Sequence, residues 1–168
     1  MTTLAIDVRR AEPDDALAIS ETHRAAWNEA YAGIIPYKTL RNMLERRSQE
    51  WWQRAIRGST SILVLEVGGM IAGYATLGLN RARSLPQEGE IYELYLKPEF
   101  QGVGLGRRLF GEARRLLASL GCRGMVVWTL EENSRAIGFY TGLGGVDIAE
   151  GSETFDRRLL KKVAFVWS

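Results

Sequence analysis

Apolar and polar residues alternate over residues 4–8, a pattern typical of a strand that buries one face. Residues 61–67 and 70–77 are two β-rich, largely apolar stretches joined by Gly68 and Gly69. A glycine pair between two β-rich stretches predicts a tight hairpin. Further strands are predicted over residues 90–96, 125–130, 146–149 and 160–166, with a polar loop between the last two.

In the first half of the chain, apolar residues recur with helical spacing between the predicted strands. The spacing predicts helices over residues 14–31 and 37–57. Leu17 is expected on the buried side of the first helix, and Trp51 on the buried side of the second. His23 is expected on the surface of its helix.

Two more helices are predicted in the second half. One begins after a glycine-rich stretch and ends at Gly121, with its arginines on the polar face. Asn133 can cap a short helix over residues 134–141, which Gly142 closes. Strands and helices that alternate in this way predict a mixed α/β domain built around one sheet, and we expect residues 1–168 to form that single domain.

Composition narrows the function classes. The chain has 168 residues and a net charge of +2, too small a charge to indicate nucleic-acid binding. Cys122 and His23 are single residues of their kind, so no internal disulfide and no His/Cys zinc cluster is expected, and we predict no metal. The sequence shows neither a signal-peptide pattern nor an apolar run of about 18 residues, so we predict a cytoplasmic protein that does not bind membranes.

The stretch QGVGLGRR, residues 101–108, carries the most specific signal. Its glycines do not have the spacing of a dinucleotide-binding fingerprint, and no Gly-Lys-Ser/Thr follows, as a P-loop would require. A tight packing turn is one interpretation. The alternative is anion binding, because the stretch joins a strand to a helix whose first N–H groups are free, and Arg107 and Arg108 add positive charge. A pyrophosphate is the anion that we expect there.

The same stretch resembles a known family. Gln101, Gly104 and Gly106 match the Gln/Arg-x-x-Gly-x-Gly/Ala signature of the GNAT superfamily of N-acetyltransferases. Residues 96–100, 133–144 and 26–36 also resemble family sequences, in the expected order. The resemblance implies one mixed, mostly antiparallel sheet flanked by about four helices, with acetyl-CoA as co-substrate and no metal.

Residue roles also follow from the resemblance. The fourth strand would diverge from the fifth and bind the pantetheine arm of acetyl-CoA through the backbone. The glycine-rich loop would bind the pyrophosphate through its N–H groups. The residues implied in acetyl-CoA binding are Leu94, Tyr95, Leu96, Gln101, Gly102, Val103, Gly104, Leu105, Gly106, Arg107, Arg108, Asn133, Arg135 and Phe139.

Acetyl transfer to an amine needs a base and an acid, because the amine is cationic at neutral pH and the departing thiolate takes up a proton. By the resemblance, Tyr140 is the acid. Glu90 and Glu93 are the candidate bases, with ordered water as the alternative; Glu93 is expected to lie deeper. Each of these residues also has a purely structural interpretation, as a core tyrosine or a solvated strand residue.

Acceptor selectivity is expected from the first two helices, the turn after the first helix and the loop before residue 90. Trp27, Tyr31 and Tyr37 could form the walls of a substrate pocket, or simply belong to the core. The predicted function is acetyl transfer from acetyl-CoA to a primary amine of a small molecule or peptide, by direct attack in a ternary complex. One alternative is an acyl-CoA sensor without efficient transfer. Another is a nucleic-acid binder, although the sequence contains no recognition motif for nucleic acid. The resemblance also implies that the chain can form a homodimer.

Two departures from the family pattern are visible. Gly145 stands where the family block usually has Phe, which predicts a missing aromatic contact. No acid precedes Glu131 near the end of the fifth strand, so a catalytic glutamate at that position is not expected.

Overall fold

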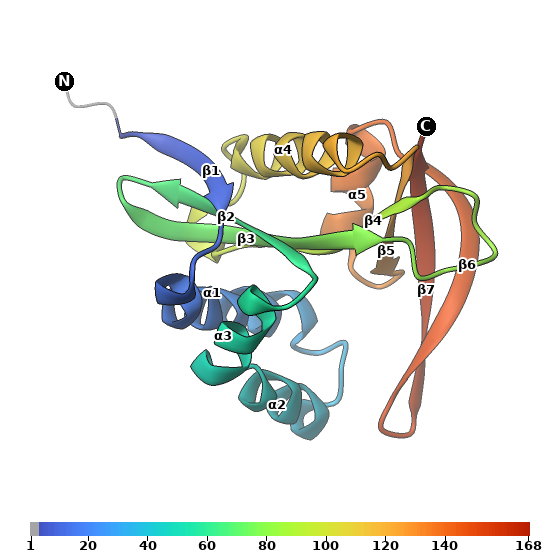
Figure 1. Ribbon diagram of the computed structural model, residues 1–168. Helices are drawn as coiled ribbons and strands as arrows, with labels where there is room; N and C mark the ends of the chain where they lie inside the picture. The colour runs from blue at the N-terminus through green and yellow to red at the C-terminus, as the bar shows by residue number, and fades with distance from the viewer. Residues whose placement is uncertain (1–3) are drawn as a thin grey trace.

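A seven-stranded sheet organises the computed structural model, which describes residues 4–168 (Figure 1). The strand order is β1-β2-β3-β4-β5-β7-β6. Neighbouring strands are antiparallel except β4 and β5, which are parallel, so the predicted mixed sheet is confirmed. The strands are β1 (Ile6–Arg10), β2 (Ser61–Val67), β3 (Met70–Leu79), β4 (Gly89–Leu96), β5 (Met125–Leu130), β6 (Val146–Phe155) and β7 (Arg158–Trp167).

Helices cover both faces of the sheet. Figure 1 shows α1 to α3 on one face and α4 with α5 on the other. The helices are α1 (Ala16–Tyr31), α2 (Tyr37–Arg46), α3 (Gln49–Arg57), α4 (Leu105–Ser119) and α5 (Ser134–Gly142), with short 3₁₀ turns at Pro13–Asp15 and Pro98–Phe100. The described residues thus form five helices, where about four were expected.

The extra helix arises because the predicted helix over residues 37–57 is broken at Arg47 and Ser48. Arg47 has a non-helical backbone, with φ −88° and ψ 56°. The Ser48 side chain accepts a hydrogen bond from the N–H of Trp51 (3.2 Å) and thereby caps a new helix. This break places the Arg47 side chain beside the sheet, where it becomes part of the site described below.

The β6–β7 hairpin is longer than the sequence suggested. The prediction of a polar loop between two short strands is wrong: β6 and β7 pair from Val146 and Val166 to a turn at Asp156, whose φ is 58°. Most of β6 is exposed, so its sequence lacks the alternation that identifies a strand with one buried face.

Two hydrophobic cores lie on opposite faces of the sheet. Leu77, Ile91 and Leu109 belong to the core under α4 and α5, and Ile19 and Trp52 belong to the core under α1 and α3. The expected burial of Leu17 and Trp51 is wrong, since Leu17 is 50% exposed and Trp51 is half-buried.

His23 is fully buried, contrary to the prediction of a surface position. It lies on the same face of α1 as Ile19 and Ala26, at spacings of four and three residues, and contacts the rings of Trp27 and Trp52. Within residues 4–168 neither ring nitrogen has a hydrogen-bond partner. Burial lowers the pKa of His23 to about 3, with Arg47 and Arg24 adding repulsion, so the ring is neutral.

The sheet opens in its middle. β4 pairs with β5 at Gly89 and Glu90, opposite Met125 and Val126, and this pairing then ends. Since β4 continues to Leu96, one of its backbone edges faces an opening rather than a strand. The implied divergence of the fourth and fifth strands is therefore present, and the candidate site forms around it.

Candidate active site

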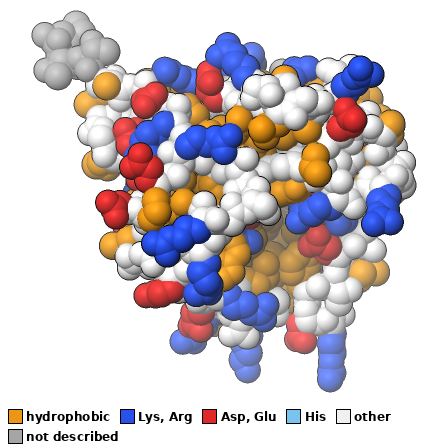
Figure 2. Space-filling view, viewed as in Figure 1, with side chains coloured by type: hydrophobic (Ala, Val, Ile, Leu, Met, Phe, Trp, Pro, Cys, Tyr) orange, Lys and Arg blue, Asp and Glu red, His pale blue; other side chains and the backbone are white. Residues whose placement is uncertain are grey.

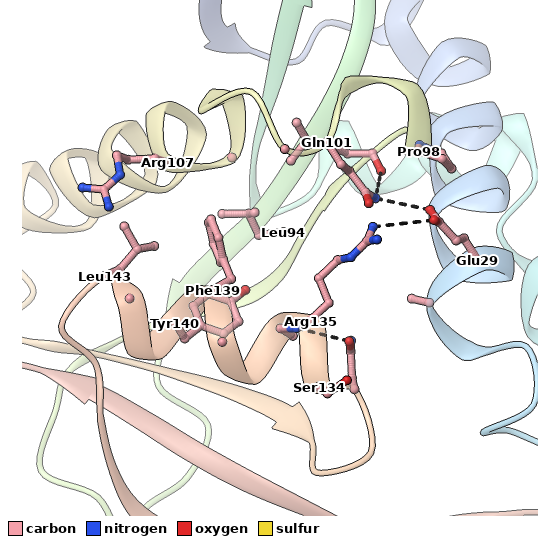
Figure 3. Close-up of a pocket in the computed structure, with 18 of the residues that line it drawn as sticks. Glu29, Leu94, Pro98, Gln101, Arg107, Ser134, Arg135, Phe139, Tyr140 and Leu143 are labelled. Atoms are coloured by element: carbon pink, nitrogen blue, oxygen red, sulfur yellow. Dashed lines mark hydrogen bonds and ion pairs between the residues drawn. The ribbon is translucent and has the colours of Figure 1, made fainter.

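A cavity of about 900 Å³ begins at this opening and extends between β4, the start of α4 and α5 (Figure 3). Many of the residues expected to bind acetyl-CoA line it. They are Leu94, Leu96, Gln101, Gly102, Gly104, Gly106, Arg107, Asn133, Arg135 and Phe139, together with Tyr140.

The glycine-rich loop has the backbone geometry of an anion site. Gly102 and Gly104 have φ of +79° and +86°, and a Cβ on either would meet nothing within 4 Å. Arg108 donates its N–H to the Gly104 carbonyl (3.3 Å), so the N–H groups of the preceding residues 105–107 lie in the first turn of α4, which is open to a ligand. The loop thus fits a diphosphate, with open space where side chains would otherwise stand.

Gly106 has a different role from the other two glycines. A Cβ there would lie 3.1 Å from the Phe139 ring, so this glycine lets α4 approach α5 closely. Tight packing thus explains Gly106, whereas Gly102 and Gly104 have positive φ and open space beside them, which fit the anion-binding interpretation.

Three residues of the predicted binding loop direct their side chains elsewhere. Val103 is 71% exposed and Leu105 is buried in the core under α4. Arg108 donates from Nη2 to the carbonyl of Ile6 (3.1 Å), which turns its charge toward β1. None of these three lines the first cavity, whereas Arg107 does.

β4 presents different residues on its two faces. Leu94 and Leu96 line the first cavity, whereas Tyr95 lines a second cavity on the opposite face. The Tyr95 hydroxyl is hydrogen-bonded to the Tyr31 hydroxyl. One strand therefore separates the two cavities and contributes side chains to both.

α5 brings Asn133 and Tyr140 to the first cavity. The Asn133 side chain accepts a hydrogen bond from the N–H of Ala136 (3.2 Å), which confirms the predicted cap. Tyr140 is 5% exposed, and its ring packs against Phe110 and Phe165. Burial raises the pKa of Tyr140 above its usual value, so the phenol stays protonated at neutral pH.

A set of polar contacts connects α1, the loop and α5 across the first cavity (Figure 3). Glu29 accepts a hydrogen bond from Gln101 (3.4 Å) and forms an ion pair with Arg135 (3.6 Å). Gln101 also donates to the carbonyl of Leu96 (3.1 Å). Gln101 thus fixes the loop to the end of β4. Sequence reasoning did not single out Glu29, which gave no signal beyond being a helix carboxylate.

The second cavity has a volume of about 500 Å³. Figure 2 shows a hollow between the helices and the β6–β7 hairpin, with hydrophobic side chains inside it. Trp27, Tyr31 and Tyr95 form aromatic walls, and the rings of Trp27 and Tyr95 lie 5.6 Å apart. Tyr37, in contrast, is 76% exposed at the start of α2 and lies outside both cavities, so its predicted place in the substrate pocket is wrong.

Glu90 and Glu93 both line the second cavity, but both are paired. Glu93 accepts hydrogen bonds from Arg47 (3.2 Å), from Tyr74 (3.0 Å) and from Thr76 (3.3 Å). Glu90 is 2% exposed and forms an ion pair with Arg81 (3.1 Å). Glu90 is thus the deeper of the two carboxylates, opposite to the prediction.

Further residues of the second cavity were missed. Trp128 comes from β5, and Glu153, Phe155 and Lys162 come from the hairpin. Lys162 lies over the Trp128 ring (4.8 Å) and pairs with Glu153 (3.2 Å). Glu153 and Phe155 fall in the predicted loop and Lys162 in the predicted strand over residues 160–166, and neither prediction gave a reason to place these residues beside β5.

Trp167 explains the departure at Gly145. A Cβ at Gly145 would lie 2.6 Å from Cζ2 of Trp167, and the Trp167 indole donates to the Leu143 carbonyl (3.1 Å). The ring also packs on Phe110 and Tyr140. The aromatic contact predicted to be missing is therefore supplied by β7, and glycine leaves room for it.

Among residues 4–168 there is no cluster of three or more His, Cys, Asp or Glu side chains that could hold a metal ion. In the same part of the chain, no helix is both long and apolar enough to cross a membrane.

Comparisons with known proteins agree with this geometry. Residues 19–144 match the sequence model of the acetyltransferase (GNAT) family. An uncharacterized N-acetyltransferase of Bacillus subtilis is 29% identical over 163 residues, covering 96% of this chain and 92% of its own. A spermidine N(1)-acetyltransferase of Thermoplasma acidophilum is 26% identical over 152 residues, covering 89% and 94%.

A solved structure shares the fold. The PaiA N-acetyltransferase of Thermoplasma acidophilum, crystallised in complex with coenzyme A, superposes with a TM-score of 0.76 at 22% sequence identity. The match covers 94% of this chain and 98% of the other.

Proposed function

Since this chain belongs to the acetyltransferase (GNAT) family, we propose that it transfers an acetyl group to a primary amine by direct attack of the amine in a ternary complex. The enzyme class, an acetyl-CoA-dependent N-acetyltransferase, follows from the family and its relatives. The acceptor class and the chemical route are the proposal. The observation that carries it is the pair of cavities on the two faces of one diverging strand.

In this proposal the first cavity holds acetyl-CoA. The N–H groups at the start of α4 and the Arg107 guanidinium bind the diphosphate, and the free edge of β4 at Leu94–Leu96 binds the pantetheine arm. Acetyl-CoA, when bound, supplies a thioester whose carbonyl carbon accepts the amine. A β4 N–H that donates to the carbonyl oxygen would stabilise the charge that develops on it.

Tyr140 is proposed as the proton donor to the sulfur. Its phenol lines the first cavity and carries a proton at neutral pH, which a general acid requires. The second cavity is proposed as the acceptor cavity, where the amine would enter among the aromatic walls that include the hydrogen-bonded Tyr31 and Tyr95.

Glu90 and Glu93 remain the candidates for the base, and Gln variants separate a catalytic role from a structural one. Loss of the base should lower kcat by about 10²–10⁴-fold at neutral pH. Loss of a structural ion pair should instead lower the free energy of unfolding, with a much smaller change in kcat. If neither E90Q nor E93Q reduces kcat in this range, the proton leaves through water rather than directly to either carboxylate.

A calorimetric titration with acetyl-CoA is the first test, with free CoA and NADH as controls. We expect one-to-one binding of acetyl-CoA and no response to NADH. An amine panel that includes spermidine, the substrate in the name of one relative, then tests transfer by mass spectrometry. Binding without transfer to any amine would favour the acyl-CoA sensor, and absence of binding would contradict both functions.

A further inference from the structure

A third cavity adjoins the acceptor cavity. It has a volume of about 570 Å³ and is lined mainly by α3 and the adjacent face of β2, β3 and β4. Arg47, Arg81, Tyr92 and Glu93 line both cavities, so the Arg47–Glu93 ion pair stands where the two meet. The cleft that an acceptor could occupy thus continues beyond the amine site.

The charge of the third cavity differs from that of the acceptor cavity. Arg47, Arg81 and Lys162 in the acceptor cavity are each paired with a glutamate, which leaves that cavity without net charge. In the third cavity Arg47 and Arg81 keep their ion pairs with Glu93 and Glu90, whereas Arg54 has no acidic partner within residues 4–168, so one positive charge is left uncompensated. Figure 2 shows Lys and Arg side chains gathered over α2 and α3, beside the hollow.

Two of these arginines are held in fixed orientations. The Arg47 guanidinium lies 4.1 Å from the centre of the Trp51 ring, and that of Arg81 lies 4.0 Å from the centre of the Tyr92 ring. An aromatic face on a guanidinium leaves its N–H edges available for hydrogen bonds. Both groups are therefore positioned before a ligand arrives.

Each of the three guanidinium groups retains unused donors. Arg47 bonds to Glu93 through Nη1, and Arg81 bonds to Glu90 through Nε and Nη2. The other nitrogens of these two side chains have no hydrogen-bond partner within residues 4–168, nor does the Arg54 side chain. A guanidinium has five N–H donors, so the cavity offers an excess of charge-assisted donors.

We propose that the third cavity is an anion subsite for the acceptor, so that the substrate carries a carboxylate or phosphate group at a distance from its reactive amine. The subsite rests on the proposed function, because it assigns the amine to the adjoining cavity. A polyamine would place a second ammonium group against three arginines, and the subsite disfavours it. An anionic group would instead receive hydrogen bonds from Arg47, Arg54 and Arg81.

Acceptors of matched length test this proposal on the whole protein with acetyl-CoA. The probes are hexylamine, hexamethylenediamine, 6-aminohexanoate and 6-aminohexyl phosphate, with shorter and longer amino carboxylates to vary the reach. At its best length an anionic acceptor should exceed the matched alkylamine in kcat/KM by about tenfold or more. The carboxylate and phosphate series distinguish the two kinds of anion. If hexamethylenediamine has the highest kcat/KM of these acceptors, the proposed subsite is wrong.

Arg54 and Arg57 provide a matched pair of variants. Both lie in the last turn of α3, but only Arg54 lines the third cavity. Arg54→Gln should reduce the preference for the anionic acceptor about tenfold, and Arg57→Gln should leave it unchanged. If both variants prefer the anionic acceptor over the matched alkylamine to the same extent, the proposal is contradicted.

Tryptophan fluorescence provides a readout that does not depend on transfer. Trp51 and Trp52 line the cavity, so binding of 6-aminohexanoate or 6-aminohexyl phosphate should change their emission in a saturable way. If these probes bind, and Arg54→Gln but not Arg57→Gln weakens their binding, while no amine is acetylated, then the third cavity is an anion site but the proposed function fails. If amines are acetylated but neither probe binds saturably, the proposed function stands and the subsite fails.

Discussion

Tyr140 has a buried ring and also lines the first cavity. A substitution that keeps the ring therefore tests the hydroxyl alone. Tyr140→Phe keeps the ring that packs against Phe110 and Phe165 and removes the hydroxyl. We expect kcat to fall by about 10²-fold or more, with little change in the affinity for acetyl-CoA. Steady-state kinetics and calorimetry on the same preparation check this. Equal losses in kcat and affinity would assign the hydroxyl to binding rather than to proton transfer.

Gly104 is required for its backbone conformation and not for space. A Cβ there would meet no atom within 4 Å, but φ is +86°, which strains any residue with a side chain. Gly104→Ala should lower the free energy of unfolding by about 1 kcal/mol or more and weaken acetyl-CoA binding, as the loop relaxes away from its anion-binding shape.

Gly111 is the matched control. It lies in α4, also with no atom within 4 Å of a Cβ, but its φ is not positive. Gly111→Ala should therefore leave acetyl-CoA binding unchanged and stabilise the protein slightly, by about 0.5–1 kcal/mol. Urea unfolding and calorimetry on both variants measure these two effects. If both variants change stability and acetyl-CoA affinity equally, the positive φ of Gly104 is not the cause.

At the scale of elements, the contact between α5 and β7 depends on Gly145. Gly145→Ala would bring a Cβ within 2.6 Å of Trp167, and we expect a loss of about 1–3 kcal/mol in the free energy of unfolding. Gly142→Ala, three residues earlier, meets no atom within 4 Å and should be close to neutral. Urea unfolding of both variants tests this. A neutral Gly145→Ala would mean that Trp167 can move away freely.

Buried elements could be predicted from the sequence, and mostly exposed elements could not. The strands over residues 61–67 and 125–130 have the predicted bounds because they are buried on both faces, so each appears in the sequence as a short continuous apolar stretch. β6 is mostly exposed and carries no such pattern. The break between α2 and α3 depends on one serine cap within a continuous helical pattern.

The candidate site divides in the same way. The glycine loop and the α5 residues form compact motifs, so their place at the first cavity was visible in the sequence. Trp128 and Lys162 reach the second cavity because β7 pairs between β5 and β6, and that pairing follows from no local pattern. The tertiary fold also decides which carboxylate is buried, so the sequence predicted the depths of Glu90 and Glu93 in the wrong order.

For the molecule as a whole, His23 couples stability to pH. An unfolded chain binds a proton on this ring near pH 6.5, whereas the folded protein keeps the ring neutral down to about pH 3. Between these values the unfolded state binds more protons. The His23 contribution is therefore fully present above about pH 6.5 and is lost as the pH falls toward 3, at up to about 1.4 kcal/mol per pH unit.

Urea unfolding at a series of pH values measures this effect. His23→Leu removes the titrating ring from the same apolar face of α1 and should flatten the decline between about pH 6 and 4. Parallel curves for the two proteins would show that other groups control acid unfolding.

The opening between β4 and β5 also bears on solubility. A strand with an unpaired edge is a template onto which another chain can add, and exposed edges promote aggregation. Here the unpaired edge of β4 faces inward, with α5 and β5 beside it. The protein can therefore keep backbone donors and acceptors free for a ligand while other protein chains have little access to them. Because the gap lies inside the sheet rather than at its border, this strand edge is open to the pantetheine arm proposed to bind there and is less accessible to other protein chains.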